Sequence, residues 1–319
     1  MKHKICDILG ISYPIIQGPM AWASDSKLAA AVSNAGGLGI MGIGFSPVEI
    51  FQSEIVNIKK LTDKPYGCNL ITAVPYADQL LEVILKEKVP VVELETMPAF
   101  YNTLPDYVEK LKNAGIILIG KASSVEDALI YEKVGVDMIS VKGADGGGHI
   151  YGFTGTFTLI PQVVDAVKIP VINSSGIGDG RGLAASFMLG AEGVEIGSRF
   201  LLADECPVHD NYKNAIMEAK EGDTAVTGAS VGDAVRGLHN HLTEKIMKIE
   251  KQYEGGEAAE KIQDLCSGCL RKAAVNGDVQ EEGTVVVGQI AGLLNKRQSA
   301  AEIMSELVAE YQTIVAGLS

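Results

Sequence analysis

A single imidazole stands directly after three glycines near the middle of the chain. The stretch runs Gly143-Ala-Asp-Gly-Gly-Gly-His149 and follows the apolar run Met138–Val141. Each glycine lowers strand or helix stability by roughly 0.5–1 kcal/mol relative to alanine, but it lets another group approach the backbone closely. Because imidazole titrates near neutral pH, His149 could donate or accept a proton beside a bound ligand. Taken alone, the stretch fits a tight turn with an incidental histidine as well as it fits a site.

The other four histidines are less well placed. His3 lies at the terminus, and His209 lies in a stretch that is typical of a loop or a helix cap. His239 and His241 are two residues apart on a predicted helix, so their side chains point in different directions. Only His149 follows a predicted strand.

Two later glycine-rich stretches could bind phosphate. They are Ser174-Ser-Gly-Ile-Gly-Asp-Gly180 and Gly197-Ser-Arg199. Backbone amides at the ends of strands and at helix N-termini bind phosphate oxygens, and serine hydroxyls add further hydrogen bonds. A pair of tight turns is the alternative, and a dinucleotide fingerprint is not satisfied because its third glycine is missing at the required spacing. We favour a phosphate site, built by Ser175, Gly176, Gly197 and Ser198.

Polar side chains follow several other predicted strands. The amides of Gln17 and Asn69 could hydrogen-bond a planar heterocycle, or they could satisfy turns at the ends of strands. Lys142 and Asp145 flank the glycines before His149, and a mutual ion pair explains them as well as a catalytic role does.

These residues follow a regular alternation of strands and helices. The predicted strands are uniformly apolar, which is typical of parallel strands that are covered on both faces. Ser24-Asp25, Ser123-Ser124 and Asp179 are good N-caps for the helices that follow them. The predicted strands are Pro14–Gln17, Leu38–Met41, Tyr66–Leu70, Val91–Leu94, Ile116–Ile119, Met138–Val141, Val171–Asn173 and Gly193–Ile196. The predicted helices include Ser26–Ala35, Pro47–Lys60, Tyr76–Lys88, Asp106–Ala114, Ser124–Val134 and Arg181–Leu189.

Eight successive β-α units predict an α/β fold, a TIM (β/α)8 barrel, with a doubly wound sheet as the alternative. In both folds the C-terminal ends of the strands carry the chemistry. We expect residues 1–203 and 291–319 to form the barrel, closed by a last helix at Ser299–Ala316. Residues 204–290 are expected to form a helical lobe that covers the mouth of the active site, with helices at Asn211–Glu221, Val231–Tyr253 and Glu257–Ala274.

The composition is that of a globular protein with a large core. The chain has 319 residues, of which 47% are hydrophobic and 21% are charged. Its formal net charge of −13 argues against nucleic-acid and anionic-membrane partners, because both would be repelled. The N-terminus has no signal-like apolar run, and no stretch reaches the roughly 20 apolar residues that span a bilayer. We therefore expect a cytoplasmic protein.

The five cysteines do not describe a disulfide scaffold. Only Cys266-Ser-Gly-Cys269 has a suggestive spacing. A zinc site would need a second pair of ligands, and His239 and His241 lack the usual spacing for one. We interpret Cys266 and Cys269 as thiols that pack between helices, and we expect no metal site.

Five motifs together resemble one flavoprotein family. The chain is similar to the FMN-dependent barrel family that contains nitronate monooxygenases (formerly 2-nitropropane dioxygenases) and FabK-type enoyl-acyl-carrier-protein reductases. The resemblance covers nearly the whole chain. The motifs are Gln17-Gly-Pro-Met-Ala-Trp22, Asn34-Ala-Gly-Gly-Leu-Gly39, Asp145-Gly-Gly-Gly-His149, Ser175-Gly-Ile-Gly-Asp-Gly180 and Gly197-Ser-Arg-Phe200.

This resemblance implies a barrel that binds FMN at its C-terminal mouth. It implies that the phosphate lies on the loops of Ser175, Gly176, Gly197 and Ser198. It further implies NADH or NADPH as co-substrate, a homodimer and a monovalent-cation requirement. The remaining cofactor-binding residues that it implies are Gln17, Gly18, Pro19, Met20 and Asn69 beside the flavin ring, with Gly147, Gly148 and the catalytic His149 facing the substrate.

The resemblance leaves two reactions open. Met20-Ala-Trp22 and Gly288-Gln-Ile-Ala-Gly-Leu-Leu294 are similar to the reductases, whereas Pro19 and Lys121-Ala-Ser-Ser124 are similar to the monooxygenases. We expect an enoyl-thioester reductase of fatty acid synthesis, with nitronate monooxygenase as the alternative and a non-catalytic flavin-binding barrel as the third. An acyl carrier protein is acidic, so binding one would require the basic residues of the lobe to gather beside the mouth.

Overall fold

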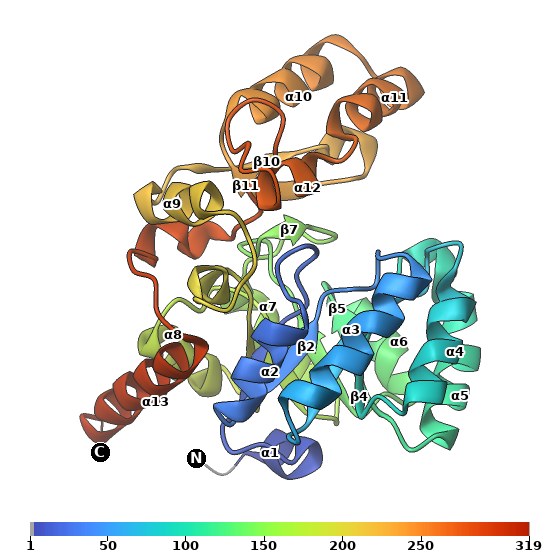
Figure 1. The fold of residues 1–319 in the computed structure, drawn as a ribbon, viewed down its shortest axis with the longest axis vertical. Coiled ribbons are helices and arrows are strands. Elements are labelled where there is room, and N and C mark those ends of the chain that lie inside the picture. Colours follow the sequence, from blue (N-terminus) through green and yellow to red (C-terminus); the bar gives the residue numbers. More distant parts are fainter. Residues whose placement is uncertain (1–2, 319) are drawn as a thin grey trace.

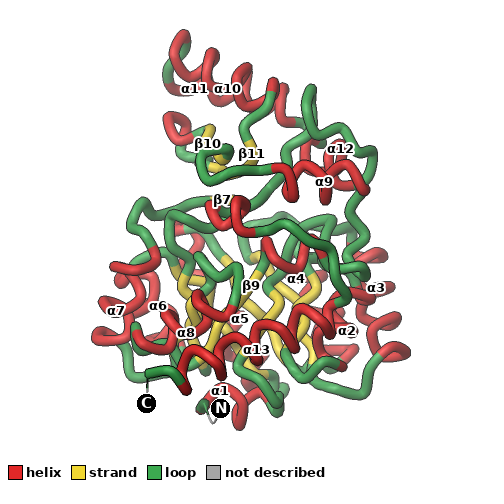
Figure 2. Tube along the Cα trace, turned by 90° about the vertical axis from the view of Figure 1, so that its left-hand side faces the viewer, coloured by secondary structure: helices red, strands yellow, loops and turns green. Residues whose placement is uncertain are grey.

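The computed structural model describes residues 3–318, and eight parallel strands form a closed barrel in them. Each strand pairs with the next one along the chain, and the last pairs with the first. Figures 1 and 2 show the barrel surrounded by helices, with a second group of elements above it. The barrel strands are β1 (Ile15–Gln17), β2 (Leu38–Met41), β3 (Tyr66–Ile71), β4 (Val91–Glu95), β5 (Ile117–Ala122), β6 (Met138–Val141), β8 (Val171–Asn173) and β9 (Gly193–Ile196).

These strands confirm the predicted barrel, and four of them have the predicted bounds. Nearly all of their residues are buried, since side chains on one face fill the barrel and those on the other pack against helices. The core inside the lower end of the barrel contains Ile16, Leu38, Val91 and Ile172. The fold follows from this pattern, because strands that are apolar on both faces need cover on both sides.

Helices cover the outside of the barrel, and the predicted caps start three of them. Asp25 accepts hydrogen bonds from the amides of Lys27 and Leu28, and Ser124 and Asp179 cap their helices in the same way. The covering elements are α2 (Ser26–Asn34), α3 (Val48–Leu61), α4 (Ala77–Glu87), η1 (Pro98–Thr103), α5 (Leu104–Asn113), α6 (Val125–Val134), α7 (Thr156–Ala166), α8 (Gly180–Met188) and η2 (Ser198–Leu202). A short helix, α1 (Lys4–Leu9), lies at the N-terminal end of the barrel (Figure 1).

The last helix, α13 (Ala300–Ala316), packs against α8 and α2 (Figure 1). Glu310 accepts a hydrogen bond of 2.7 Å from the amide of Gly180, at the start of α8. Met304 contacts the position of Gly37, just before β2. This helix therefore covers the seam between the first and last barrel units, as the sequence predicted.

The upper group of elements contains the expected helices and also strands, which the sequence did not predict. A three-stranded antiparallel sheet has the order β10-β11-β7. Its strand β7 (Gly148–His149) comes from the barrel's glycine-rich loop, which ties the two parts together. The other elements are α9 (Asp210–Glu218), β10 (Thr224–Thr227), η3 (Ala229–Val231), β11 (Val235–Leu238), α10 (His241–Gln252), α11 (Gly255–Cys266), α12 (Cys269–Ala274) and η4 (Gln289–Leu293).

Two long helices expected in this region are each interrupted. The expected helix Val231–Tyr253 holds β11 in its first part, and α10 begins only after Asn240, which forms a capping box with Thr243. His239 therefore precedes the helix on which it was expected. The expected helix Glu257–Ala274 breaks at Gly268, whose φ of +69° favours glycine. The division at residues 203/204 and 290/291 stays a prediction.

No helix within residues 3–318 combines the length and the apolar character that crossing a membrane would need.

Candidate functional site

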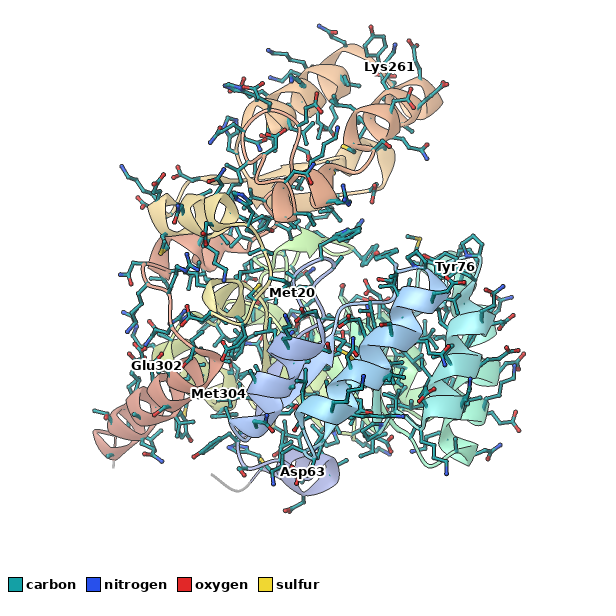
Figure 3. The ribbon with its side chains drawn as sticks, in the orientation of Figure 1. Met20, Asp63, Tyr76, Lys261, Glu302 and Met304 are labelled. Atoms are coloured by element: carbon teal, nitrogen blue, oxygen red, sulfur yellow. The ribbon has the colours of Figure 1, made fainter. Side chains whose placement is uncertain are left out.

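A cavity of about 740 Å³ lies between the C-terminal ends of the barrel strands and the upper elements. Figure 3 shows Met20 between these two parts of the molecule. Of the residues that the sequence predicted for the site, the following line the cavity: Gly18, Pro19, Met20, Asn69, Gly147, Gly148, His149, Ser175, Gly176, Gly197 and Ser198. The structure therefore brings together motifs that lie far apart in the sequence.

Gln17 is the one predicted residue that does not line the cavity. Its side chain is fully buried, and Nε2 donates hydrogen bonds to the carbonyl oxygens of Gly18 and Ile40. Its Oε1 has no hydrogen-bond partner among the described residues. The structure thus places this amide outside the cavity lining, where its hydrogen bonds join the end of β1 to β2.

Asn69 reaches the cavity at the end of β3, with part of its amide already engaged. Its Oδ1 accepts a hydrogen bond of 2.7 Å from the amide of Gly44. Its Nδ2 has no acceptor within residues 3–318. The NH2 group of Asn69 is therefore free to donate to a ligand, whereas its oxygen already accepts a hydrogen bond.

The expected phosphate loops present fewer free groups than the sequence indicates. The amide of Ser175 donates to Oδ1 of Asn173, and its hydroxyl accepts from the amide of Gly143. The hydroxyl of Ser198 accepts from the amide of Gly288. The amides of Gly176, Gly197 and Ser198 have no acceptor in the described part of the chain. These three amides remain available to an anion.

His149 projects from the short strand β7 on the lobe side of the cavity. Its backbone pairs with Val235 of β11, and its Nε2 lies 3.3 Å from Oδ1 of Asp233. Its ring is nearly parallel to that of Tyr151, with the ring centroids 6.2 Å apart. The hydrogen bond from His149 lowers the pKa of Asp233. His149 is therefore oriented by a carboxylate and faces the cavity, which is the arrangement of a proton donor or acceptor.

Glycine is required beside His149 because two segments meet there. A Cβ atom on Gly147 would lie 2.6 Å from the carbonyl carbon of Val287, closer than side-chain atoms can come. The glycine run thus lets the chain before η4 pass directly over the loop, and the backbone of Asp145 accepts a hydrogen bond from Gln289. This contact fixes the position of β7 over the barrel.

Lys142 and Asp145 do not form the ion pair that the sequence allowed. Asp145 instead accepts hydrogen bonds from the amide and the hydroxyl of Thr156, at the start of α7. Lys142 lines the cavity, and its ammonium group makes no ion pair or hydrogen bond with the described residues. A Cβ atom on Gly148 would lie 3.5 Å from its Nζ, so the ammonium group is beside the histidine loop. Desolvation lowers the pKa of Lys142 to about 8.

A buried group of charges that the sequence analysis missed forms the barrel side of the cavity. It consists of Glu93 on β4, Lys121 on β5 and Glu195 on β9. Lys121 pairs with Glu195 and lies 3.5 Å from Glu93. Serine hydroxyls complete the group, because Ser140 donates to Glu195, and Lys121 donates to Ser174 over 2.8 Å.

The two carboxyl groups of this cluster titrate in opposite directions. Burial, with Glu195 close by, raises the pKa of Glu93 well above its usual range. Although burial acts against it, Lys121 lowers the pKa of Glu195 to about 2. Burial and the neighbouring Glu195 therefore favour the protonated form of Glu93, whereas Glu195 and Lys121 form the charged pair of the cluster.

One signal in the sequence could have identified this cluster. Glu93 and Glu195 stand inside runs that are otherwise apolar, Val91–Leu94 and Gly193–Ile196. A carboxyl group in a strand that is covered on both faces needs a partner inside the barrel. Lys121 likewise is the one charged residue in an otherwise apolar strand, Ile117–Ala122.

Comparisons with known proteins identify the family of the chain. The family model described as nitronate monooxygenase matches residues 2–310. A probable nitronate monooxygenase of Staphylococcus aureus strain N315 is 34% identical, with 98% of each chain covered. One from Staphylococcus saprophyticus is 36% identical over 86% of this chain and 88% of that protein.

Solved structures match over nearly the full length. FabK from Thermotoga maritima has a TM-score of 0.93 and 39% identity, covering 100% of this chain and 98% of that one. A nitroalkane oxidase from Streptomyces ansochromogenes has a TM-score of 0.84 and 26% identity, with 99% of each chain covered. The chain therefore belongs to the nitronate monooxygenase family and is a flavin-dependent oxidoreductase.

Proposed function

We propose that the protein is an FMN-dependent enoyl-thioester reductase that takes electrons from NADH or NADPH. The observation that carries the proposal is the match to FabK. At 39% identity over the whole chain, it exceeds the 26% identity to the nitroalkane oxidase over a similar length. When bound, FMN would supply the hydride that reduces the β-carbon of the enoyl group.

The residues around the cavity fit FMN. The three free amides of Gly176, Gly197 and Ser198 suit a phosphate group without any fixed positive charge. Asn69 offers its side-chain NH2 group at the end of β3, and Gly18 and Pro19 also line the cavity. Met20 lies between this wall and the upper elements (Figure 3). We propose that these residues hold the phosphate and the flavin ring.

Two residues would act on the substrate, and a third would orient one of them. His149 would polarise the thioester carbonyl or supply the proton, while Asp233 orients its ring. Lys142 places a second donor beside the same loop. Because its pKa is about 8, its ammonium group is mostly protonated at neutral pH and can stabilise negative charge that develops on an oxygen atom.

Nitronate monooxygenase is the second candidate, and Lys142 is the observation that favours it. A nitronate is an anion, and an unpaired ammonium group in the cavity is a binding group for an anion. The curated relatives at 34% and 36% identity carry that name. If the neutral nitroalkane is bound instead, His149 would act as the base that removes its α-proton and forms the nitronate.

Anaerobic mixing of the flavin-loaded protein distinguishes the two reactions. We expect NADH or NADPH to bleach the flavin absorbance rapidly, and a crotonyl thioester to restore it in the absence of oxygen. Indifference to both nicotinamides, together with bleaching by an alkyl nitronate, would replace the reductase with the monooxygenase. A protein that stays yellow with every donor would be a flavin-binding barrel without either activity.

The carrier of the acyl group is a further part of the proposal. Lys245 and Lys272 of the lobe are paired with Glu281 and Glu282, at 3.9 and 2.7 Å. Arg271 lies over the ring of Trp22, 5.9 Å from its centroid. These basic groups are already engaged, so we expect an acyl carrier protein to give little advantage over a coenzyme A thioester. Comparing kcat/KM for the two carriers tests this.

The homodimer and the monovalent-cation requirement stay predictions. Gel filtration tests the first, and activity assays in different salts test the second.

A further inference from the structure

The two cysteines of the Cys266-Ser-Gly-Cys269 segment line the cavity, although the sequence analysis interpreted them as packing thiols. Cys266 is the last residue of α11, and Cys269 is the first residue of α12. Both side chains are half-buried, and both contact the small core of the lobe around Leu242, Ile246 and Ile262. Figures 1 and 2 show α12 on the barrel side of the lobe and α11 farther out.

The backbone between the cysteines has the geometry of a type II β-turn. Ser267 has φ −56° and ψ 113°, and Gly268 has φ 69° and ψ 11°. A type II turn has central angles of about −60° and 120°, then about 80° and 0°, with glycine preferred at the second position. Such a turn brings its first and fourth Cα atoms within about 7 Å, and a disulfide joins Cα atoms that are about 4.4–6.8 Å apart. The turn therefore holds the two cysteines in the range of a disulfide.

The two thiols are also electrostatically unequal. The hydrogen bond from Cys266, helped by one from Thr284, lowers the pKa of Cys269 to about 6. The same interaction, with burial, raises the pKa of Cys266. At neutral pH Cys269 is therefore largely a thiolate, and Cys266 is the thiol that supports it. Within residues 3–318 no third ligand joins them in a group that could hold a metal ion.

We propose that Cys266 and Cys269 form a peroxide-reactive dithiol in the wall of the cavity, with Cys269 as the nucleophile and Cys266 as the resolving thiol. The Cys269 thiolate attacks one oxygen of hydrogen peroxide, which gives a sulfenic acid and hydroxide. The Cys266 thiol then loses its proton and displaces hydroxide from that sulfur, which forms the disulfide. Two thiols and one peroxide give one disulfide and two waters, and the two sulfur atoms lose the two electrons that the peroxide gains.

The oxidation experiment uses the flavin-loaded full-length protein. After a pulse of hydrogen peroxide, intact-mass spectrometry should show the loss of two hydrogen atoms per chain, and peptide mapping should place the new bond between Cys266 and Cys269. Dithiothreitol should reverse it. Added oxygen atoms on Cys269 without a disulfide, or a disulfide that maps to other cysteines, would overturn the proposal.

Variants distinguish disulfide formation by Cys266 and Cys269 from unspecific oxidation of the cysteines. Cys269→Ala should abolish the disulfide, and Cys266→Ala should leave Cys269 to accumulate as sulfenic or sulfinic acid. Cys6→Ser is the matched control, because Cys6 is also half-buried but burial raises its pKa. This variant should form the disulfide as the parent does, and a loss of the disulfide in it would contradict the proposal.

Alkylation measures the nucleophile directly. The rate at which iodoacetamide modifies Cys269 should reach half its maximum near pH 6, because the thiolate is the reacting form. In Cys266→Ala the half-maximum should move to higher pH, and the rate at pH 6 should fall several-fold. A Cys269 that reacts like an ordinary exposed thiol in both proteins would refute its assignment as the nucleophile.

Discussion

The two walls of the cavity hold their charged groups in different ways. On the barrel wall, the side chains of Glu93, Lys121 and Glu195 are 0%, 12% and 4% exposed. On the lobe wall, the side chains of His149 and Asp233 are 35% and 63% exposed, and they are 3.3 Å apart. One wall is a desolvated cluster of side chains from three barrel strands, and the other is an ion pair open to solvent.

This difference separates the tasks of the two walls. Strand pairing holds the barrel cluster rigidly, and burial makes its interactions strong and hard to remove. The lobe pair depends on a strand of only two residues, Gly148–His149, and water screens its charges. We therefore expect the barrel wall to determine stability and the electrostatic environment of the bound ligand, while the lobe wall carries out proton transfer.

The largest effect should come from replacing the histidine of the lobe wall. In His149→Ala we expect turnover to fall by about 10²–10⁴-fold, the usual contribution of a general acid or base, while flavin stays bound. Stopped-flow assays and the visible spectrum measure the two quantities separately. His241→Ala is the control, because His241 also pairs with a carboxylate, Glu281, at 2.7 Å but lies on the lobe surface. Equal turnover in the two variants would remove His149 from the mechanism.

The next largest effect should appear in the stability of the barrel wall. Lys121→Met leaves Glu195 buried without its cation, and breaking such a pair costs about 3–5 kcal/mol in free energy of unfolding. Urea unfolding of the flavin-free protein measures it. Lys296→Met removes a cation from an exposed pair with Glu306 and should cost about 0–1 kcal/mol. If the two variants lose the same stability, the buried cluster is not a special feature of the barrel.

The contrast between the walls also explains what the sequence could predict. The barrel follows from local patterns, because each apolar strand, cap and helix is visible within one short stretch. The strand-end motifs around Asn69, Ser175 and Gly197 could be placed for the same reason. Charged residues inside apolar strands mark Glu93, Lys121 and Glu195 one by one, but the sequence does not show that they meet, because their contact depends on which side chains of three separate strands point into the barrel.

The lobe was harder to predict, since its strands are short and contacts between distant segments decide which residues become strand or helix. The strand Val235–Leu238 exists because it pairs with Thr224–Thr227 on one side and with the histidine loop on the other. Isolated apolar runs of this length do not distinguish a strand from part of a helix. Gly268 was the visible sign that the helix expected at Glu257–Ala274 is broken.

A smaller effect of opposite sign should follow from removing the unpaired ammonium group. Burial lowers the pKa of Lys142 from 10.5 to about 8, so between these two pH values the unfolded chain binds more protons and stability rises with pH. Below pH 8 the lysine is charged in the folded state as well, so the folded state bears the full free-energy cost of burying that charge. We therefore expect Lys142→Met to raise the free energy of unfolding of the flavin-free protein by about 1–3 kcal/mol at pH 7.

The pH dependence tests this explanation. The advantage of Lys142→Met should shrink as the pH rises from 8 toward 10.5, and it should disappear only above 10.5, where the parent lysine is neutral in both states. Lys121 offers the contrast, because its paired ammonium group has a raised pKa and stabilises the fold. A Lys142→Met protein that is less stable than the parent at pH 7 would show that the ammonium group has a partner.

The smallest effect should come from the carboxylate of the lobe wall. Asp233 is mostly exposed, and exposed ion pairs contribute about 0–1 kcal/mol, so Asp233→Asn should lower turnover only about two- to fivefold. Because dissolved ions screen such a pair, raising the salt concentration should slow the parent protein toward the variant and leave the variant nearly unchanged. A loss close to that of His149→Ala, insensitive to salt, would mean that bound ligand shields the pair from water. The lobe wall would then resemble the barrel wall during turnover, and the division of tasks between the walls would hold only for the empty cavity.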